Sequence, residues 1–267
     1  MIRVCIAGAT GWAGSELARA ASNTSDLSVV SAVSRTHAGK QLGHVLGESD
    51  LSAPIFASVT DALSVSSDVL VEYTTAASAK ANITAALKGG RNVVVGTSGL
   101  SESDFSDIDA VARRWKRGVL ACGNFALTAV LLQRFAEAAA RIIPQWEIID
   151  YASDAKRDAP SGTVRELAAR LAKVRAPTTT IPISETVGSR EVRGGTLDGS
   201  QVHSVRLPGY VISAEIVFGM ADQRLTIRHD SGTSARPYVD GALMAIRKVS
   251  ALAPGLHRGL DAVLDVG

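Results

Sequence analysis

The sequence predicts an α/β protein of two domains, an α/β domain with a parallel sheet and an α+β domain with a mostly antiparallel sheet. Short β-branched runs alternate with helical patterns in the first half of the chain, which is typical of a parallel sheet covered by helices on both faces. Residues 180–230 instead contain consecutive β-type stretches separated by Gly and Pro, without a convincing helix, which indicates an α+β domain. A last helical pattern predicts a discontinuous first domain, 1–124 with 236–267, around a second domain of 125–235.

The expected elements follow the chain in this order. In the first domain, strands are expected at 2–7, 28–34, 69–74, 92–97 and 119–122, with helices from about Trp12 and at 76–88 and 101–116. In the second domain, helices are expected at 128–142 and 163–173, and strands at 147–152, 201–207, 211–218 and 223–229. The returning helix is expected at 238–248.

Composition excludes several classes of function. Hydrophobic residues make up 46% of the chain and charged residues 20%, a balance typical of a globular protein. The 28 Lys and Arg nearly balance the 26 Asp and Glu, so we expect a small-molecule ligand and no nucleic acid. No apolar run approaches the roughly 20 residues that span a bilayer, and no export signal precedes the first strand, so we expect a cytoplasmic protein without a membrane partner.

A glycine-rich turn follows the first predicted strand and precedes the first helix. It reads Gly8-Ala9-Thr10-Gly11-Trp12-Ala13-Gly14, with glycines at GxxGxxG spacing, a variant of GxGxxG. Such glycines allow a tight turn and let the backbone approach a pyrophosphate, whose charge the free N–H groups and the helix dipole stabilise. The turn predicts a Rossmann-type dinucleotide-binding domain. For Trp12, packing is favoured over stacking on adenine.

The end of the second strand bears on the choice of cofactor. It reads Ser34-Arg35, where an enzyme that uses NAD normally has a carboxylate for the ribose hydroxyls. Because no carboxylate repels a 2′-phosphate here and an arginine could bind one, NADPH is favoured over NADH, which stays an alternative. The competing interpretation is that Arg35 is a solvated surface residue.

The string Lys156-Arg157-Asp158-Ala159-Pro160-Ser161-Gly162-Thr163 precedes an amphipathic helical pattern. Thr163 and Glu166 have the spacing of a capping box, which predicts a helix start at this point. Unpaired N–H groups at Ser161, Gly162 and Thr163 could therefore hold a carboxylate.

With this string the chain resembles the 4-hydroxy-tetrahydrodipicolinate (dihydrodipicolinate) reductase family of lysine and diaminopimelate biosynthesis. Further segments that resemble the family are 72–74, 96–99, 123–125, 193–195, 203–209 and 225–229. The resemblance implies hydride transfer from a nicotinamide to a cyclic imine with two carboxylates, and a homotetramer formed through the substrate-domain sheet. It implies a substrate site at Lys156, Ser161, Gly162 and Thr163. It implies, together with the patterns above, cofactor-binding residues Gly8, Thr10, Gly11, Trp12, Gly14, Ser34, Arg35, Tyr73, Thr74, Gly96, Thr97, Gly99, Gly123, Asn124 and Phe125.

The family pattern breaks where its histidine pair, whose first member is taken as the proton donor, should precede the lysine. Ala152 and Ser153 occupy these positions, and neither side chain can act as an acid near neutral pH. Three hypotheses follow: the family reaction with Tyr151, Lys156 or water as donor, a related imine reductase with another acceptor, or a dinucleotide-binding protein without catalysis. We expect Tyr151 and Lys156 to be the catalytic residues.

Other chemistry-bearing residues have simpler interpretations. The opening glycine turn also resembles that of semialdehyde dehydrogenases, which use a cysteine nucleophile, and Cys122 is the one candidate. Cys122 ends an apolar strand, however, which favours a buried cysteine. The histidines lack metal-ligand spacing, so no metal is expected, and a hydrogen-bonded structural role is favoured for His203.

Overall fold

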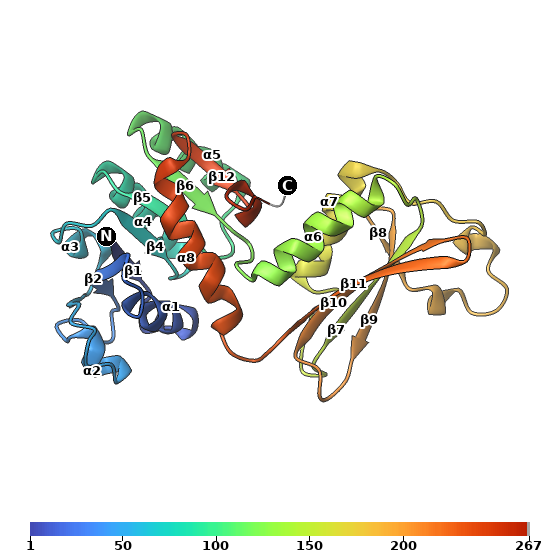
Figure 1. Cartoon of the computed structure of the whole chain (residues 1–267), viewed down its shortest axis with the longest axis horizontal. Coiled ribbons are helices and arrows are strands. Elements are labelled where there is room, and N and C mark those ends of the chain that lie inside the picture. Colours follow the sequence, from blue (N-terminus) through green and yellow to red (C-terminus); the bar gives the residue numbers. More distant parts are fainter. Residues whose placement is uncertain (266–267) are drawn as a thin grey trace. The chain divides into compact units, whose positions relative to one another are not determined.

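The computed structural model describes residues 1–265 and divides the chain into two compact units, each with its own sheet (Figure 1). The second unit spans Leu127–Ser234. The first combines Met1–Ala126 with the described residues from Ala235 onward, so the chain enters and leaves the second unit once.

The first unit contains a parallel sheet in the order β12-β6-β5-β4-β1-β2-β3. The strands are β1 (Ile2–Ala7), β2 (Leu27–Val33), β3 (Ile55–Phe56), β4 (Val69–Glu72), β5 (Asn92–Val95), β6 (Gly118–Ala121) and β12 (Gly255–Arg258). The central strands are buried on both faces and are accordingly rich in Val, Ile and Leu throughout, without alternation of polar residues. Because all strands run parallel, their carboxyl ends meet at one edge, where the glycine turn lies.

Helices cover both faces of this sheet. They are α1 (Trp12–Ser22), α2 (Leu42–Leu46), α3 (Val59–Ala62), α4 (Ala76–Lys88), α5 (Glu102–Arg114) and α8 (Val239–Lys248). Buried side chains of α3, α4 and α5 pack on one face in a cluster that includes Ile83 and Ile108, while α1 and α8 pack together on the other (Figure 1). The predicted Rossmann-type α/β architecture is confirmed.

The second unit has a mixed sheet in the order β11-β10-β7-β9-β8, in which only β7 and β9 pair in parallel. Its elements are α6 (Leu127–Ala140), β7 (Trp146–Ala152), α7 (Gly162–Val174), β8 (Gly195–Leu197), β9 (Ser200–Arg206), β10 (Ile212–Met220) and β11 (Gln223–Ser231). Helices α6 and α7 lie on one face of this sheet (Figure 1). They pack there with Ile148, Ile216 and Phe218, while alternate residues of β7 face the other way. The expected mostly antiparallel sheet is confirmed.

The sequence patterns missed the shortest elements. These are α2, α3, β3, β8, β12 and the 3₁₀ turns at Ile183–Glu185, Arg190–Arg193, Arg236–Tyr238, Val249–Ala251 and Leu260–Ala262. Segments of two to five residues are too short to show a period, and tertiary contacts fix them instead. Among the described residues, no helix has the length and apolar content needed to cross a bilayer.

Candidate active site

The turn between β1 and α1 is closed by backbone contacts. Gly8 has a φ of +82°, in the left-handed region that glycine adopts without strain. Its N–H donates to the Val33 carbonyl at 3.0 Å, and its own carbonyl accepts from the Gly11 N–H at 3.0 Å. A Cβ on Gly14 would lie only 2.2 Å from the Gly8 carbonyl oxygen. A side chain at Gly14 would therefore force this turn open.

The start of α1 presents free backbone donors. Gly11 is the N-cap, and no side chain in the described part of the chain caps the first turn. No acidic residue lies in that turn, so the positive end of the helix dipole is uncompensated. Trp12 is 60% exposed and packs edge-on against Tyr238, with ring centroids 5.7 Å apart. This close, glycine-lined backbone with open N–H groups fits a diphosphate.

The end of β2 lies beside this turn. The Thr10 and Ser34 hydroxyl oxygens are 2.8 Å apart, which ties the glycine turn to the end of the strand. Arg35 is exposed and makes no hydrogen bond or ion pair with the described residues. Its guanidinium is therefore available to a phosphate group, an arrangement that a solvated surface arginine would also show.

A buried carboxylate, Glu72, organises the ends of β4 and β5. Its side chain is fully buried and accepts hydrogen bonds from the Thr74 N–H at 2.8 Å, from Asn82 at 3.0 Å and from the Thr97 hydroxyl at 3.3 Å. Burial raises the pKa of this carboxyl, and the hydrogen bonds partly oppose the shift. Two of the expected cofactor residues, Thr74 and Thr97, are thus held by one acid.

An aromatic pair lies at the same edge of the sheet. The rings of Tyr73 and Phe125 meet edge to face, with centroids 6.0 Å apart. A Cβ on Gly96 would lie 2.0 Å from Tyr73 Cε1 and 2.9 Å from the Phe125 ring, so only glycine fits. The other expected positions in the loops after β5 and β6 are Gly99, Gly123 and Asn124. The structure therefore gathers the expected cofactor residues at the carboxyl ends of the parallel strands, where dinucleotides bind in this fold class.

The start of α7 differs from the sequence expectation by two residues. Ser161, in extended conformation, is the N-cap, and its Oγ accepts from the Val164 N–H at 3.4 Å. The expected capping box at Thr163 and Glu166 is therefore wrong. Both Ser161 and Thr163 are good cap residues by type, and the backbone conformation decides between them.

The three backbone N–H groups expected to bind a carboxylate, those of Ser161, Gly162 and Thr163, are not equivalent. The Ser161 N–H donates to Asp150 Oδ2 at 2.8 Å and is occupied. The N–H groups of Gly162 and Thr163 have no partner among the described residues, as expected for the first turn of a helix. The start of α7 thus offers two adjacent free backbone donors.

A buried ion pair lies directly behind this turn. Asp150 is fully buried on β7, and Arg206 at the end of β9 donates to its Oδ2 at 2.6 Å. Sequence reasoning missed both residues. An acid directly after the apolar residues Ile148 and Ile149 was the available signal, because a buried charge requires a partner.

Lys156 lies in the loop that joins β7 to α7. Its Nζ is 2.7 Å from Asp158 Oδ1, and its side chain keeps 29% of its surface exposed. The Lys156 hydrogen bond lowers the pKa of Asp158. The loop therefore carries an ammonium group that solvent reaches, a few residues before the free N–H groups of α7.

Tyr151 points to the other face of the sheet from its neighbours Asp150 and Ala152. Its hydroxyl donates to Glu215 Oε2 at 3.3 Å, and its ring stacks on Tyr210 with centroids 5.1 Å apart. Burial and the nearby Glu215 charge raise the pKa of this phenol. The structure therefore brings Lys156, but not Tyr151, to the loop and helix start that carry the other substrate-binding candidates.

The two positions of the substituted histidine pair carry no acid. Ala152 is fully buried beneath the helices. The Ser153 hydroxyl donates to Asp154 Oδ1 at 3.2 Å and accepts from the Ala155 N–H at 3.3 Å. Ser153 thus shapes the start of the loop that carries Lys156.

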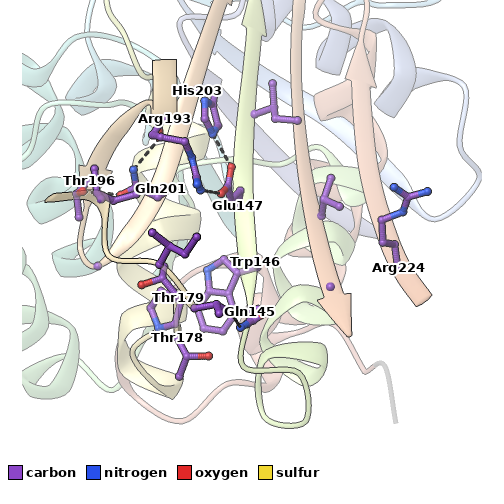
Figure 2. A pocket seen from close by; sticks show the side chains of 18 residues that line it. Gln145, Trp146, Glu147, Thr178, Thr179, Arg193, Thr196, Gln201, His203 and Arg224 are labelled. Atoms are coloured by element: carbon purple, nitrogen blue, oxygen red, sulfur yellow. Dashed lines mark hydrogen bonds and ion pairs between the residues drawn. The ribbon is translucent and has the colours of Figure 1, made fainter. Parts of the chain in front are cut away.

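The open face of the second sheet holds a separate polar cluster (Figure 2). His203 Nε2 lies 2.7 Å from Glu147 Oε2, Arg193 pairs with the other oxygen of Glu147, and Gln201 donates to the Arg193 carbonyl at 2.7 Å. These residues line a cavity of about 920 Å³. His203 is therefore engaged on a face that does not carry the start of α7.

Two observations bear on the alternative chemistries, one at Cys122 and one at the residue types that bind metals. Cys122 is only 6% exposed, just beyond the end of β6. Within residues 1–265, no three His, Cys, Asp or Glu side chains gather as a metal site would require.

Comparisons with known proteins agree over both units. The family model described as dihydrodipicolinate reductase, N-terminus, matches residues 2–125, and the model of its C-terminus matches residues 128–264. A 4-hydroxy-tetrahydrodipicolinate reductase of Moorella thermoacetica is 39% identical over 99% of this chain and 98% of its own length. One from Desulfitobacterium hafniense is 37% identical over 99% of both chains.

A solved structure shares the whole fold. The dipicolinate-bound dihydrodipicolinate reductase of Paenisporosarcina sp. TG-14 superposes with a TM-score of 0.87 at 31% identity, covering 99% of this chain and 100% of that one.

Proposed function

The chain belongs to the dihydrodipicolinate reductase family, and we propose that it uses NADPH to reduce a cyclic imine that carries two carboxylates, as in the step that gives the family its name. It is an NAD(P)H-dependent oxidoreductase. The observation that carries the choice of substrate is the pair of free N–H groups at Gly162 and Thr163 beside the loop that holds Lys156. Backbone donors at a helix start suit a carboxylate, and the ammonium group suits a second negative charge. We place this activity in the cytoplasm.

The first unit is proposed to hold the dinucleotide. The turn from Gly8 to Gly14 would bind the diphosphate through backbone N–H groups, and Arg35 would pair with the 2′-phosphate of NADPH. Thr74 and Thr97, held by Glu72, and the aromatic pair Tyr73 and Phe125 would shape the nicotinamide end. The bound nicotinamide would supply the hydride.

The second unit is proposed to hold the imine and to deliver the proton. Reduction of an imine places a proton on nitrogen while hydride reaches carbon, and a positioned acid contributes about 10²–10⁴-fold. We assign this acid to the Lys156 ammonium, directly or through a water molecule. Tyr151 is the weaker choice because its side chain lies on the face of β7 away from Asp150 and the start of α7, and because burial raises the pKa of its phenol.

A second acceptor deserves a separate test because Ala152 and Ser153 stand where the family has its histidine pair. The two small side chains remove the family's usual proton donor. A related cyclic imine with a more basic nitrogen needs less help from an acid. We therefore keep a different imine acid as the alternative substrate.

An assay of NADPH oxidation with freshly generated 4-hydroxy-tetrahydrodipicolinate tests the proposal. We expect turnover within the ordinary enzyme range of roughly 1–10³ per second. If NADPH is oxidised in the presence of another cyclic imine acid but not of 4-hydroxy-tetrahydrodipicolinate, the alternative acceptor is favoured. No oxidation by either would overturn the proposed reaction.

Replacing Lys156 tests the assignment of the acid. Lys156→Met keeps the length of the side chain but removes the proton, and we expect kcat to fall about 10²-fold or more. Lys173, an exposed lysine near the end of α7, provides the matched control, and Lys173→Met should leave kcat unchanged. An unaltered kcat in Lys156→Met together with a loss in Tyr151→Phe would transfer the role to Tyr151.

The open face of the second sheet is proposed as the interface of a homotetramer. Val217 lies on β10 opposite Glu147 and lines the same cavity as Glu147 and His203. Light scattering should give the mass of four chains, and Val217→Arg should lower it. A monomer in the unmutated protein would exclude this assembly.

A further inference from the structure

We propose that the buried Asp150–Arg206 pair is the positioning element of the substrate site: it sets the start of α7 and the Lys156 loop so that both act on one carboxylate-bearing ligand. This inference rests on the proposed function. It concerns two residues that contact the ligand only through others, so they are positioning residues and not catalytic ones.

Asp150 anchors the N-cap of α7 to the sheet. Its Oδ2 accepts the Ser161 N–H at 2.8 Å, and the Ser161 side chain then caps Val164. One residue of the helix start is thereby anchored to the middle of the sheet, and the two following N–H groups, of Gly162 and Thr163, remain free. Without this anchor the turn could rotate, and the free donors would no longer converge on an anion.

Arg206 holds the loop at a second point. Its Nη2 donates to Asp150 Oδ2 at 2.6 Å and to the Asp158 carbonyl at 2.8 Å, while Nη1 donates to the Asp150 carbonyl at 3.2 Å. Asp158 in turn holds the Lys156 ammonium at 2.7 Å. One guanidinium therefore links β7, β9 and the loop that carries the proposed acid.

The bonding of this pair is incomplete, which argues against a purely stabilising role. Asp150 Oδ1 and Arg206 Nε are buried and have no hydrogen-bond partner within residues 1–265. Unsatisfied buried atoms weaken a protein, and a buried ion pair can often be replaced by apolar residues without loss of stability. The positive charge of Arg206 also cancels the negative charge of Asp150, which alone would repel a carboxylate ligand.

Arg206→Lys is the decisive variant because lysine keeps the charge but cannot hold Asp150 and the Asp158 carbonyl in one planar fork. We expect KM for the imine and Kd for pyridine-2,6-dicarboxylate to rise together by at least about tenfold. Kd for NADPH should stay within about twofold. A purely structural defect would instead reduce the fraction of active protein, and so the apparent kcat, with KM and Kd unchanged.

A matched control is available between the two helices of the same unit. Arg170 on α7 is as buried as Arg206, with 17% of its side chain exposed, and pairs with Glu137 on α6 at 2.5 Å, so Arg170→Lys makes the same exchange at another ion pair. It should leave both KM and Kd within about twofold. An equal rise in Arg170→Lys would show a general effect of losing an arginine in this unit and overturn the inference.

Two substitutions of Asp150, to Asn and to Ala, test the inference even if Arg206→Lys does not fold. Asp150→Asn retains an oxygen that can accept the Ser161 N–H, whereas Asp150→Ala does not, so Kd for the dicarboxylate should rise from wild type to Asn to Ala. Equal values in all three would overturn the inference while the proposed function stands. A wild-type protein that neither binds the dicarboxylate nor reduces the imine would overturn both.

Discussion

The starts of α1 and α7 have the same proposed task, to bind an anion with backbone N–H groups, but they are held in different ways. At α1 the cap is Gly11, and close packing of Gly14 on the Gly8 carbonyl shapes the turn without any charged side chain. At α7 the cap is Ser161, which a buried carboxylate and an arginine anchor from behind. The shape of the α1 site thus depends on glycines without side chains, whereas that of the α7 site depends on hydrogen bonds made by side chains.

This difference predicts different sensitivities to mutation. A site shaped by steric contact fails when an atom is added, because the backbone has no room to move. A site shaped by hydrogen bonds tolerates added atoms but fails when a partner is removed. The predictions below test this contrast, from the largest expected effect to the smallest.

The same substitution should act oppositely at the two helix starts. In Gly14→Ala the new methyl would lie 2.2 Å from a backbone oxygen, so we expect a loss of about 2–3 kcal/mol in stability and at least tenfold weaker NADPH binding. In Gly162→Ala the nearest atom, at the end of the Arg165 side chain, is 3.8 Å away, and stability should hold or rise by about 0.5 kcal/mol. Thermal unfolding of both variants measures the contrast, and equal losses would contradict it.

Arg35 is the charged side chain that we assign to the cofactor in the first unit. Arg35→Ser should weaken NADPH binding about tenfold and leave NADH binding unchanged, because only NADPH carries the 2′-phosphate. Fluorescence titration with both cofactors provides the measurement. If the two affinities fall equally, or neither changes, Arg35 is a surface residue.

Ser161→Ala removes the cap of α7. We expect a loss of about 1 kcal/mol in the free energy of unfolding, because the Val164 N–H loses its acceptor. The matched control is Ser101→Ala, which removes the capping serine of α5. This helix belongs to the first unit and not to the unit that contains α7. Both variants should lose similar stability in denaturant titrations, but only Ser161→Ala should weaken binding of the dicarboxylate.

The two units should respond to pH in opposite directions. Burial raises the pKa of Glu72 above its ordinary 4.5, so the stability it contributes is present below pH 4.5 and is lost as the pH rises through the folded-state pKa. Burial lowers the pKa of His229 below 6.5, so its contribution is present above pH 6.5 and is lost as the pH falls through the folded-state pKa. Each slope can reach at most about 1.4 kcal/mol per pH unit.

The variants Glu72→Gln and His229→Gln isolate these two slopes. The free energy of unfolding is measured between pH 4 and 8 for each variant and for the wild type. The difference between Glu72→Gln and wild type should change with pH above about pH 4.5, and that between His229→Gln and wild type below about pH 6.5. Slopes of the same sign would refute the assignment. His229 accepts or donates one hydrogen bond, to Thr128 at 2.9 Å, so glutamine can keep this contact.

The sequence predicted local features well and distant pairs poorly. The glycine turn, the alternation of strands and helices, and the change of period after residue 180 are all local patterns, and the structure contains each of them. Asp150 and Arg206 lie 56 positions apart, and no spacing rule joins them. Only the register of β7 on β9, which places Asp150 opposite Ser204, brings the pair together.

Tyr151 shows how a usable signal can be outweighed. In β7 every second residue faces the helices, so a residue next to Ala152 must face away from it. In the sequence, Trp146 and Ile148 mark the buried side of this alternation, although Asp150 shares it and the apolar Ile149 lies on the other side. The phenol of Tyr151 and its place beside the motif favour a proton donor, whereas this alternation turns its side chain away from Asp150 and the start of α7.

The parallel pairing of β12 with β6 bears on how the chain folds during synthesis. Strand β6 leaves the ribosome before the second unit, but its partner β12 follows only after that unit has been translated. Strand β6 therefore has no partner on its outer side while the second unit is synthesised and folds. A stalled nascent chain that ends before residue 255 should carry a formed second sheet and an unprotected β6 in hydrogen exchange.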